Sequence, residues 1–229
     1  MDSTSRSHYR LVVTIDGPAG SGKTTVSKLL AQRLGYRYLD TGALYRAVAV
    51  AAQQGGVDPA DDAALAQLCH GIDLDLQEGG DGLRVLLNAE DITGRLRAPA
   101  ISLLASTISA RPVVRRFLLT TQRSIGAEKG LVAEGRDMGT VVFPEAEAKF
   151  FLDADPHVRA RRRYEELQAG GDGPSLDSVE EQMVQRDRND TTRSVAPLKP
   201  AVDALRIDAT HLTPEQVIAR MMTHIESKR

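Results

Sequence analysis

Apolar runs and amphipathic stretches follow one another along most of the chain. Residues 11–15 (LVVTI) are apolar and β-branched, as in a buried strand, and a Gly-rich segment follows them. The next stretch, residues 23–34, carries apolar side chains at helical spacing, namely Val26, Leu29, Leu30 and Leu34. Gly35 is a suitable end for this helix. The pattern predicts a strand–loop–helix unit at the start of the fold.

The same alternation predicts the rest of a core. Further core strands are expected at residues 131–133, 148–154 and 204–209. A helix is expected from about Ala43, where Asp40 or Thr41 can cap the first turn. Other helices are expected at residues 60–69, 155–168, 175–190 and 213–225. Strands that alternate with helices form a parallel sheet covered on both faces, so the predicted class is α/β, a three-layer sandwich with a parallel central sheet.

The spacing of apolar and polar residues changes in the middle of the chain. Residues 72–77 alternate between apolar and polar, a Gly-rich turn follows, and residues 83–88 form a second run, which predicts a small antiparallel meander. Residues 103–127 read as helical with a break at Arg111 and Pro112, because proline cannot continue a helix interior. We therefore expect a small inserted domain at residues 60–127, within a core of residues 10–59 and 128–229.

Composition narrows the classes of protein. The chain has 229 residues, a net charge of −2 and one cysteine, Cys69, which excludes an internal disulfide and fits a reducing compartment. Cys69 reads as a small buried hydrophobic residue. No apolar run approaches the roughly 20 residues of a membrane span. The polar residues 1–9 read as a disordered tail rather than a secretory signal. We expect a cytoplasmic monomer that binds neither membrane nor nucleic acid.

Residues 17–24 (GPAGSGKT) match the phosphate-loop pattern G-x-x-x-x-G-K-[ST], between a predicted strand and a predicted helix. The glycines let successive backbone N–H groups point at one anion, and the helix adds its positive end. Lys23 can reach the β- and γ-phosphates of a nucleoside triphosphate, and the Thr24 hydroxyl can join a Mg²⁺ shell. The predicted triphosphate-binding set is Gly17, Pro18, Ala19, Gly20, Ser21, Gly22, Lys23, Thr24 and Thr25.

The phosphate loop alone does not identify the acceptor of the phosphoryl group. A GTPase would carry the guanine-reading pattern N-K-x-D, which the sequence lacks. A motor ATPase would carry an acidic metal ligand after a longer apolar strand; the nearest candidate, Asp153, leads into an arginine-rich helix. The five histidines match no metal spacing. A phosphate monoester needs no histidine base, because it is already mostly dianionic at neutral pH.

Arginines are plentiful in the second half of the chain. One predicted helix carries Arg159, Arg161, Arg162 and Arg163 beside the flexible segment 169–174. These arginines form either a solvated charged face or a lid, at about residues 156–176, that closes over the phosphate loop. Other arginines are expected in loops: Arg46, Arg136, Arg186 and Arg193. Because guanidinium groups bind phosphate bidentately, this set suits an anionic acceptor.

Four segments resemble the bacterial cytidylate kinases. They are TIDGPAGSGKTT from Thr14, YLDTGALYRAVA from Tyr38, AEGRDMGTVVFPEAEAKFFLDA from Ala133 and RNDTTRSVAPLKPA from Arg188. With the meander, the resemblance covers nearly the whole chain. It implies a P-loop kinase that transfers a phosphoryl group from ATP to CMP or dCMP with Mg²⁺, and that binds the monophosphate (NMP) through the inserted domain. Small departures are Thr41 for serine, Glu134 for aspartate and Asn189 for a charged residue.

The resemblance implies roles by position. Catalytic roles fall to Lys23, Arg136, Arg159, Arg162 and Arg186. The acceptor phosphate is assigned to Thr41, Arg46, Arg136 and Arg186, the cytosine base to Ser106, Arg115 and Asp137, and the sugar to Asp190 and Arg193. A carboxylate such as Asp137 can accept from the cytosine amino group, while Arg115 donates to the ring acceptors; the same carboxylate would repel the carbonyl of uracil. Arg115 as a surface residue, and Asp137 as a magnesium or water-orienting group, remain open alternatives.

Two other functions remain open on the sequence. One is a kinase for another monophosphate or a small metabolite, which turnover of CMP, dCMP, UMP and AMP would distinguish. The other is a nucleotide-binding switch with no acceptor, which would release ADP from ATP whether or not CMP is present.

Overall fold

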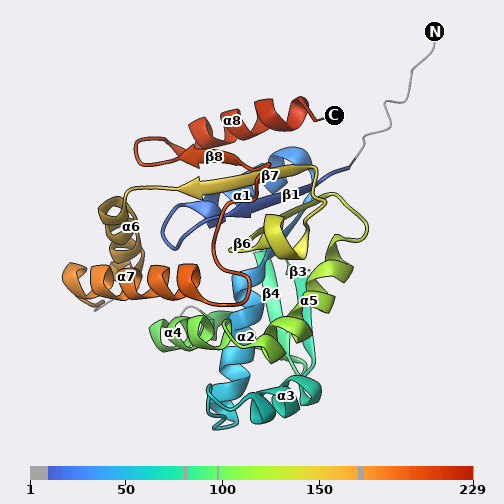
Figure 1. Ribbon diagram of the computed structural model, residues 1–229, viewed down its shortest axis with the longest axis vertical. Coiled ribbons are helices and arrows are strands. Elements are labelled where there is room, and N and C mark those ends of the chain that lie inside the picture. Colours follow the sequence, from blue (N-terminus) through green and yellow to red (C-terminus); the bar gives the residue numbers. More distant parts are fainter. Residues whose placement is uncertain (1–9, 80–81, 97, 170–172, 229) are drawn as a thin grey trace.

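A five-stranded parallel sheet forms the centre of the molecule in a computed structural model that describes residues 10–79, 82–96, 98–169 and 173–228 (Figure 1). The predicted tail at residues 1–9 lies outside the described residues, as does part of the segment 169–174. The strand order is β2-β6-β1-β7-β8. Its strands are β1 (Val12–Asp16), β2 (Arg37–Asp40), β6 (Leu131–Gly135), β7 (Ala148–Asp153) and β8 (Leu205–Asp208).

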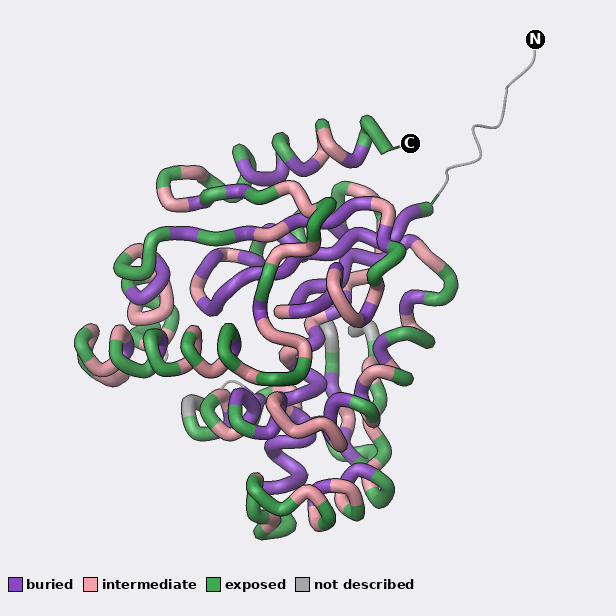
Figure 2. The backbone as a smooth tube through the Cα atoms, in the orientation of Figure 1, coloured by how far each residue is buried: buried purple, intermediate pink, exposed green. Residues whose placement is uncertain are grey.

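Helices cover both faces of this sheet, which confirms the predicted α/β class. On one face, α1 (Lys23–Leu34) and α8 (Pro214–Glu226) pack in a buried cluster with the apolar side chains of the strands. On the other face, α2 (Thr41–Gln54) starts directly after β2, and Asp40 caps it by accepting from the Ala43 N–H. Buried residues concentrate in the central strands and in α2 (Figure 2).

A smaller unit is built around α2. The antiparallel sheet β3-β4-β5 confirms the predicted meander, with strands Leu74–Gly79, Gly82–Leu87 and Glu90–Asp91. The helices α3 (Asp62–Gly71), α4 (Pro99–Ile108) and α5 (Pro112–Gly126) also contact α2, and Thr93–Arg95 form one 3-10 turn. The chain breaks between α4 and α5 just before Pro112, as predicted. Cys69 is buried in the core of this unit, which confirms its reading as a hydrophobic residue.

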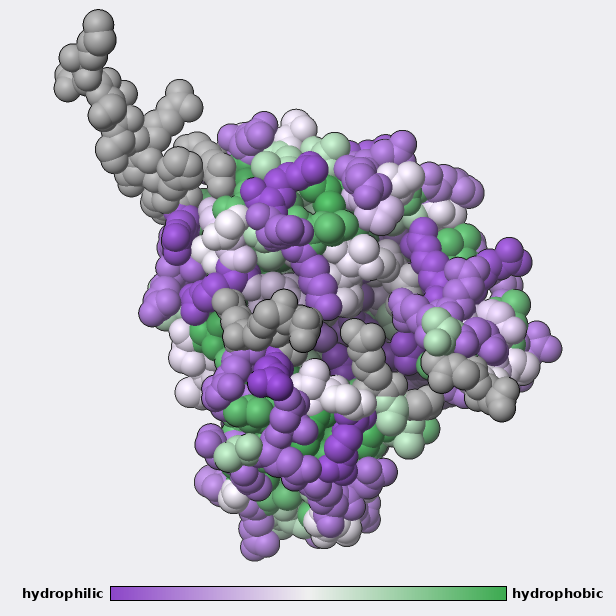
Figure 3. Space-filling model, turned by 180° about the vertical axis from the view of Figure 1, so that it is seen from behind, coloured by the Kyte–Doolittle hydropathy of each residue, from purple (hydrophilic) through white to green (hydrophobic). Residues whose placement is uncertain are grey.

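Two further helices, α6 (Pro156–Gln168) and α7 (Leu176–Thr192), pack against each other at one side of the central sheet (Figure 1). Seen from behind, the surface is mostly hydrophilic, with hydrophobic atoms in small patches (Figure 3). None of the helices in the described ranges combines the length and the apolar character that crossing a bilayer requires.

One local expectation was wrong, and two elements were not predicted. The strand β2 was not predicted, because its four residues include Arg37 and Asp40 and form no apolar run; its place is set by pairing with β6. Arg46 and Arg186 lie on α2 and α7 rather than in loops. The segment Met138–Val142 forms one turn of π-helix, an element with no clear sequence signature.

Candidate active site

The phosphate loop joins β1 to α1 at the carboxyl end of the sheet. Gly17 (φ 153°) and Gly20 (φ 70°) hold the turn that a side chain would prevent. A Cβ on Gly17 would lie 1.9 Å from the Leu152 carbonyl oxygen, and one on Gly20 would lie 2.6 Å from that of Arg159. Gly22 (φ 90°) directly precedes α1. The loop therefore has the compact backbone that anion binding requires.

Lys23 is buried under this loop. Its ammonium group donates to the Pro18 carbonyl oxygen over 2.6 Å and lies 3.4 Å from the Ser21 hydroxyl. Burial, and then repulsion by Arg136, lower the pKa of Lys23 to about 7. A triphosphate bound in the loop would add negative charge beside this ammonium group and so stabilise its protonated form. Thr24 and Thr25 lie at the exposed start of α1, and Ser21 and Ala19 are buried or nearly so.

Arg136, Arg186 and Asp190 form the cluster nearest the loop. Arg136 follows β6, and its Nε donates to Asp190 on α7 over 2.8 Å. Burial lowers the pKa of Arg136, but the charge and hydrogen bond of Asp190, together with the charges of Glu134 and Asp187, outweigh it and leave the pKa raised. Burial, and then repulsion by Arg136, lower the pKa of Arg186 to about 10. The buried Nε of Arg186 finds no hydrogen-bond partner in the described residues. This cluster therefore has a charged N–H donor that an anionic ligand could pair with.

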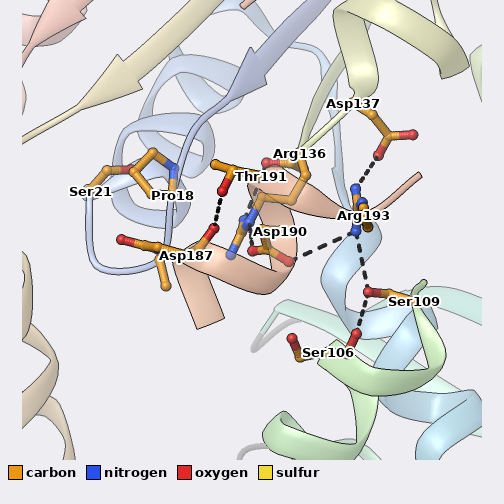
Figure 4. Close-up of polar contacts among 12 residues, drawn as sticks. Pro18, Ser21, Ser106, Ser109, Arg136, Asp137, Asp187, Asp190, Thr191 and Arg193 are labelled. Carbon is orange, nitrogen blue, oxygen red and sulfur yellow. Dashed lines mark hydrogen bonds and ion pairs between the residues drawn. The ribbon is translucent and has the colours of Figure 1, made fainter. Parts of the chain in front are cut away.

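A second cluster is centred on Asp137. Arg115 on α5 donates to one oxygen of this carboxylate, and Arg193 at the end of α7 lies 3.7 Å from the other. Arg193 also reaches the Ser109 hydroxyl at 3.3 Å (Figure 4). A cavity of about 190 Å³ borders Arg115 and Asp137, and its other walls are mainly apolar. The structure thus brings Arg115 and Asp137, both named from the sequence, into one cavity.

The Ser106 hydroxyl lies near the second cluster on α4. This hydroxyl is buried and has no partner among the residues the structure describes. The backbone carbonyl oxygen of Ser106 accepts from the Ser109 hydroxyl over 2.8 Å. Ser109 was missed by the sequence reasoning, and only its position between Ser106 and Arg193 reveals it. An unpaired buried hydroxyl is costly, so a polar ligand atom at this point would be favourable.

Thr41 and Arg46 begin α2 at the edge of the same region. The Thr41 hydroxyl donates to the Glu134 carbonyl oxygen over 2.7 Å. Nη2 of Arg46 donates to the Asp40 carboxylate over 2.7 Å, and a second oxygen of Asp40 caps the helix. Asp40 thereby holds Arg46 in place and was also missed as a site residue.

Glu134 is the last but one residue of β6 and lies next to Thr24 at the start of α1. One of its carboxylate oxygens accepts from the Thr24 hydroxyl over 3.1 Å and the other accepts from the Tyr38 hydroxyl. Burial, and then the nearby charge of Asp40, raise the pKa of Glu134. This carboxylate is only 4% exposed. It is therefore a buried oxygen donor next to the one threonine that the motif assigns to a metal.

Asp16 also supports the site, and the sequence reasoning did not single it out. Its carboxylate accepts from the backbone N–H groups of Met138 and Gly139, each over 2.8 Å. These bonds tie the end of β1 to the π-helical turn that follows Asp137. Burial raises the pKa of Asp16 to about 7.

The arginines of α6 face different ways. Nη1 of Arg162 lies 4.0 Å from the position a Cβ would take on Gly22, and its Nη2 donates to the Ala209 carbonyl oxygen over 2.8 Å. Arg163 pairs with Glu166 at 3.0 Å on the surface, and Arg161 is exposed. Arg159 is only 5% exposed and is bound to backbone oxygens. Of these four, Arg162 is the one placed to meet an anion in the loop.

Volume alone does not locate the site. A more open cavity of about 510 Å³ lies beside β8, and its walls include Asp153, Asp155 and Asp208. Carboxylates there disfavour a phosphate. The predicted residues meet elsewhere, where a phosphate loop faces a buried arginine cluster at the carboxyl end of a parallel sheet. Together with the fold, this arrangement defines a P-loop kinase.

Comparisons with known proteins narrow the class. The family model of cytidylate kinases matches residues 13–227. The cytidylate kinase of Citrifermentans bemidjiense is 50% identical over 218 residues, which cover 95% of this chain and 94% of that protein. That of Vibrio cholerae serotype O1 is 46% identical over 222 residues, covering 97% and 99%. An uncharacterized protein from Eubacterium ventriosum shares the fold, with a TM-score of 0.53 and 13% identity over 95% of this chain and 99% of its own. The chain belongs to the cytidylate kinase family.

Proposed function

We propose that the protein transfers the γ-phosphoryl group of ATP to CMP or dCMP and releases CDP or dCDP with ADP. The observation that carries this proposal is the Asp137 carboxylate, held between Arg115 and Arg193 beside a cavity. The charges of Arg136 and Arg186 act on Lys23 of the phosphate loop, and Asp190 links Arg136 to Arg193 of this cluster. An acceptor nucleotide bound there has its base at Asp137 and its phosphate facing the triphosphate.

Base selection follows from the hydrogen-bonding groups of the second cluster. Cytosine offers an amino group beside two acceptors, whereas uracil offers a carbonyl in place of the amine. Asp137 accepts from the amine, Arg115 donates to the acceptors, and the free Ser106 hydroxyl supplies a further polar contact. A uracil carbonyl against Asp137 would leave two buried acceptors facing each other, which disfavours UMP.

Phosphoryl transfer requires little proton chemistry here, because the acceptor phosphate is a dianion at neutral pH. The task of the site is to hold two anions in line and to neutralise the charge that develops. Lys23 and Arg162 serve the donor, whereas Arg136 and Arg186 serve the acceptor. Asp190 orients Arg136, and it lies within 3.8 Å of Arg193 on the sugar side.

The residues around Thr24 fit a magnesium ion. The Thr24 hydroxyl and the buried Glu134 carboxylate are hard oxygen donors that already lie 3.1 Å apart, and Tyr38 fixes the carboxylate from the far side. Mg²⁺ prefers a few protein oxygens together with substrate phosphates, so two such groups beside the loop suffice. When bound, the ion neutralises charge on the β- and γ-phosphates.

The domain roles remain part of the proposal. The unit of residues 60–127 carries Ser106 and Arg115, which supports its role as the NMP-binding domain. The lid role is assigned to residues at about 156–176, of which 170–172 lie outside the described residues. We also propose that the protein acts as a cytoplasmic monomer. Its small net charge of −2 and the mostly hydrophilic face in Figure 3 are consistent with this assignment.

A coupled assay across CMP, dCMP, UMP and AMP tests the function. We expect fast turnover of CMP or dCMP, at least about tenfold slower turnover of UMP, and no ADP release with ATP alone. Lys23→Ala should remove turnover while the circular dichroism spectrum stays unchanged. Equal use of UMP and CMP would refute the base assignment, and ADP release independent of any acceptor would refute the kinase assignment.

A further inference from the structure

Arg159 is bound on three sides by protein groups. Its Nε donates to the Ala154 carbonyl oxygen over 3.0 Å, and its Nη1 donates to the carbonyl oxygen of Ala19 in the phosphate loop over 3.1 Å. Its Nη2 lies 2.7 Å from the Asp187 carboxylate on α7. The side chain is 6% exposed. Each nitrogen of this guanidinium group is therefore already engaged by a protein group.

Asp187 belongs to the same helix as the acceptor groups. On α7, Asp187 pairs with Arg159, whereas Asp190 binds Arg136 and lies near Arg193. Figure 4 shows Asp187 toward the loop that carries Pro18 and Ser21, and Asp190 toward Arg193. The Asp187 charge also contributes to the raised pKa of Arg136. One turn of α7 thus carries two carboxylates: Asp187 faces the loop that binds the phosphoryl donor, and Asp190 faces the residues assigned to the phosphoryl acceptor.

Packing joins the loop to these helices as well. Ala19 is part of a small buried cluster with Ala160 of α6 and with Val179 and Met183 of α7. Gly20 lies so close to α6 that a Cβ would approach the Arg159 carbonyl oxygen to 2.6 Å. The phosphate loop and the first turn of α6 are therefore in close contact at this point.

We propose that Arg159 and Asp187 are a pair of positioning residues that fix the donor loop to the acceptor helix, and that Arg159 does not contact the transferred phosphoryl group. The proposal rests on the proposed kinase function, and it assigns the pair a defined task. By holding the Ala19 carbonyl oxygen, Arg159 sets the backbone N–H groups of the loop at the correct distance from Arg136 and Arg186. A loop held in this way binds the triphosphate without a further cost of ordering its backbone, so loss of the pair should weaken ATP binding.

The pair is tested with Asp187→Asn, Arg159→Lys and the double variant. Asp187→Asn removes the nearer of the two carboxylates paired with Arg159, since Asp153 lies 3.8 Å from its Nε. Arg159→Lys keeps the charge, but its single nitrogen cannot reach all three acceptors in the geometry of the guanidinium fork. We expect each single variant to raise KM for ATP and Kd for a non-hydrolysable ATP analogue by about tenfold, as expected for the loss of one charge-assisted hydrogen bond. KM for CMP should stay within about twofold. The double variant should be no worse than Arg159→Lys, because residues that act as a unit are not additive.

Two further variants separate positioning from general damage. Asp187→Glu keeps the charge and should restore much of the ATP affinity. Glu128→Gln, which breaks the exposed pair of Glu128 and Arg37, is the matched control and should leave both KM values unchanged. Circular dichroism and thermal unfolding verify that every variant is folded.

Several outcomes would overturn the proposal. If Arg159→Lys lowered kcat with unchanged binding of the ATP analogue, Arg159 would act directly on the transferred group. Additive effects in the double variant, or an unchanged Kd in both single variants, would show that the pair does not position the loop. Binding of the ATP analogue is measured without an acceptor, so it is independent of the kinase assignment. The kinase assignment is tested separately, by whether the wild-type protein phosphorylates CMP or dCMP and releases no ADP without an acceptor.

Discussion

Arg136 and Asp190 are bound to each other across the acceptor site, with Nε of the arginine 2.8 Å from Oδ2 of the aspartate. The bond joins the residue after β6 to the last turn of α7. Only 17% of the Arg136 side chain and 5% of the Asp190 side chain are exposed, so little solvent screens the pair. Asp190 thereby holds a permanently charged guanidinium group in a fixed orientation before any ligand binds.

Arg136→Ala should mainly impair use of the acceptor. A charge-assisted hydrogen bond to phosphate contributes about 2 kcal/mol, which corresponds to roughly a 30-fold rise in KM for CMP. KM for ATP should change far less, because Lys23 and the loop backbone hold the donor. Steady-state kinetics with each substrate varied in turn measure both values. Arg84→Ala, which alters an exposed pair on β4, serves as the control, and an unchanged KM for CMP in Arg136→Ala would refute the assignment.

Asp137→Asn should weaken discrimination against UMP. The amide keeps the shape of the carboxylate but can donate to the uracil carbonyl, so the penalty for UMP falls while cytosine loses a charged acceptor. We expect kcat/KM for CMP to fall by about a hundredfold and the CMP-to-UMP ratio to fall by at least about tenfold. Competition between the two nucleotides in one assay gives the ratio directly. A ratio equal to that of the wild-type protein would favour a magnesium or water-orienting role for Asp137.

Glu134→Gln should raise the Mg²⁺ concentration needed for half-maximal rate by about tenfold, because a neutral amide is a weaker ligand for a hard cation. Tyr38→Phe should have a smaller effect in the same direction, since it removes the group that orients the carboxylate. Binding of Mn²⁺ with ADP, followed by electron paramagnetic resonance, provides a readout that does not depend on turnover. Unchanged Mn²⁺ affinity in Glu134→Gln would show that another group completes the metal shell.

The buried Asp16 predicts a pH dependence of stability. Its pKa is raised to about 7, so from about pH 4 to pH 7 the folded protein keeps a proton that the unfolded chain has lost. The stability contributed by this group is therefore full at low pH, is lost as the pH rises through 7, and is constant above that. As the pH rises from about 5 to about 8, the wild-type protein should lose roughly 2.5 kcal/mol of its free energy of unfolding, and Asp16→Asn should not show this loss. Urea unfolding of both proteins measures this, and a difference independent of pH would contradict it.

Local patterns predicted the elements that have strong periodicity. The phosphate loop, the meander and the helix break before Pro112 depend on neighbours in the chain, so they could be read before the fold was known. The strand β2 could not, because its four residues owe their conformation to pairing with β6. Ser109, Asp40 and Asp16 were missed for a similar reason. Each of these side chains acts through a hydrogen bond to a residue of another element or to the start of the adjoining helix. The identity of a short polar residue does not reveal such a partner before the fold is known.

The sequence by itself determined the class of fold, the phosphate loop and the resemblance that places this chain among the cytidylate kinases. All three are properties of local order and of residue identity at fixed spacing. The tertiary structure alone decided which arginines are available to bind a ligand. Arg159 and Arg162 are three positions apart on one helix, but the first is buried against backbone oxygens and Asp187, whereas the second lies near Gly22. A guanidinium group carries the same charge in both places, and only the groups packed around it determine whether it is left to bind a ligand.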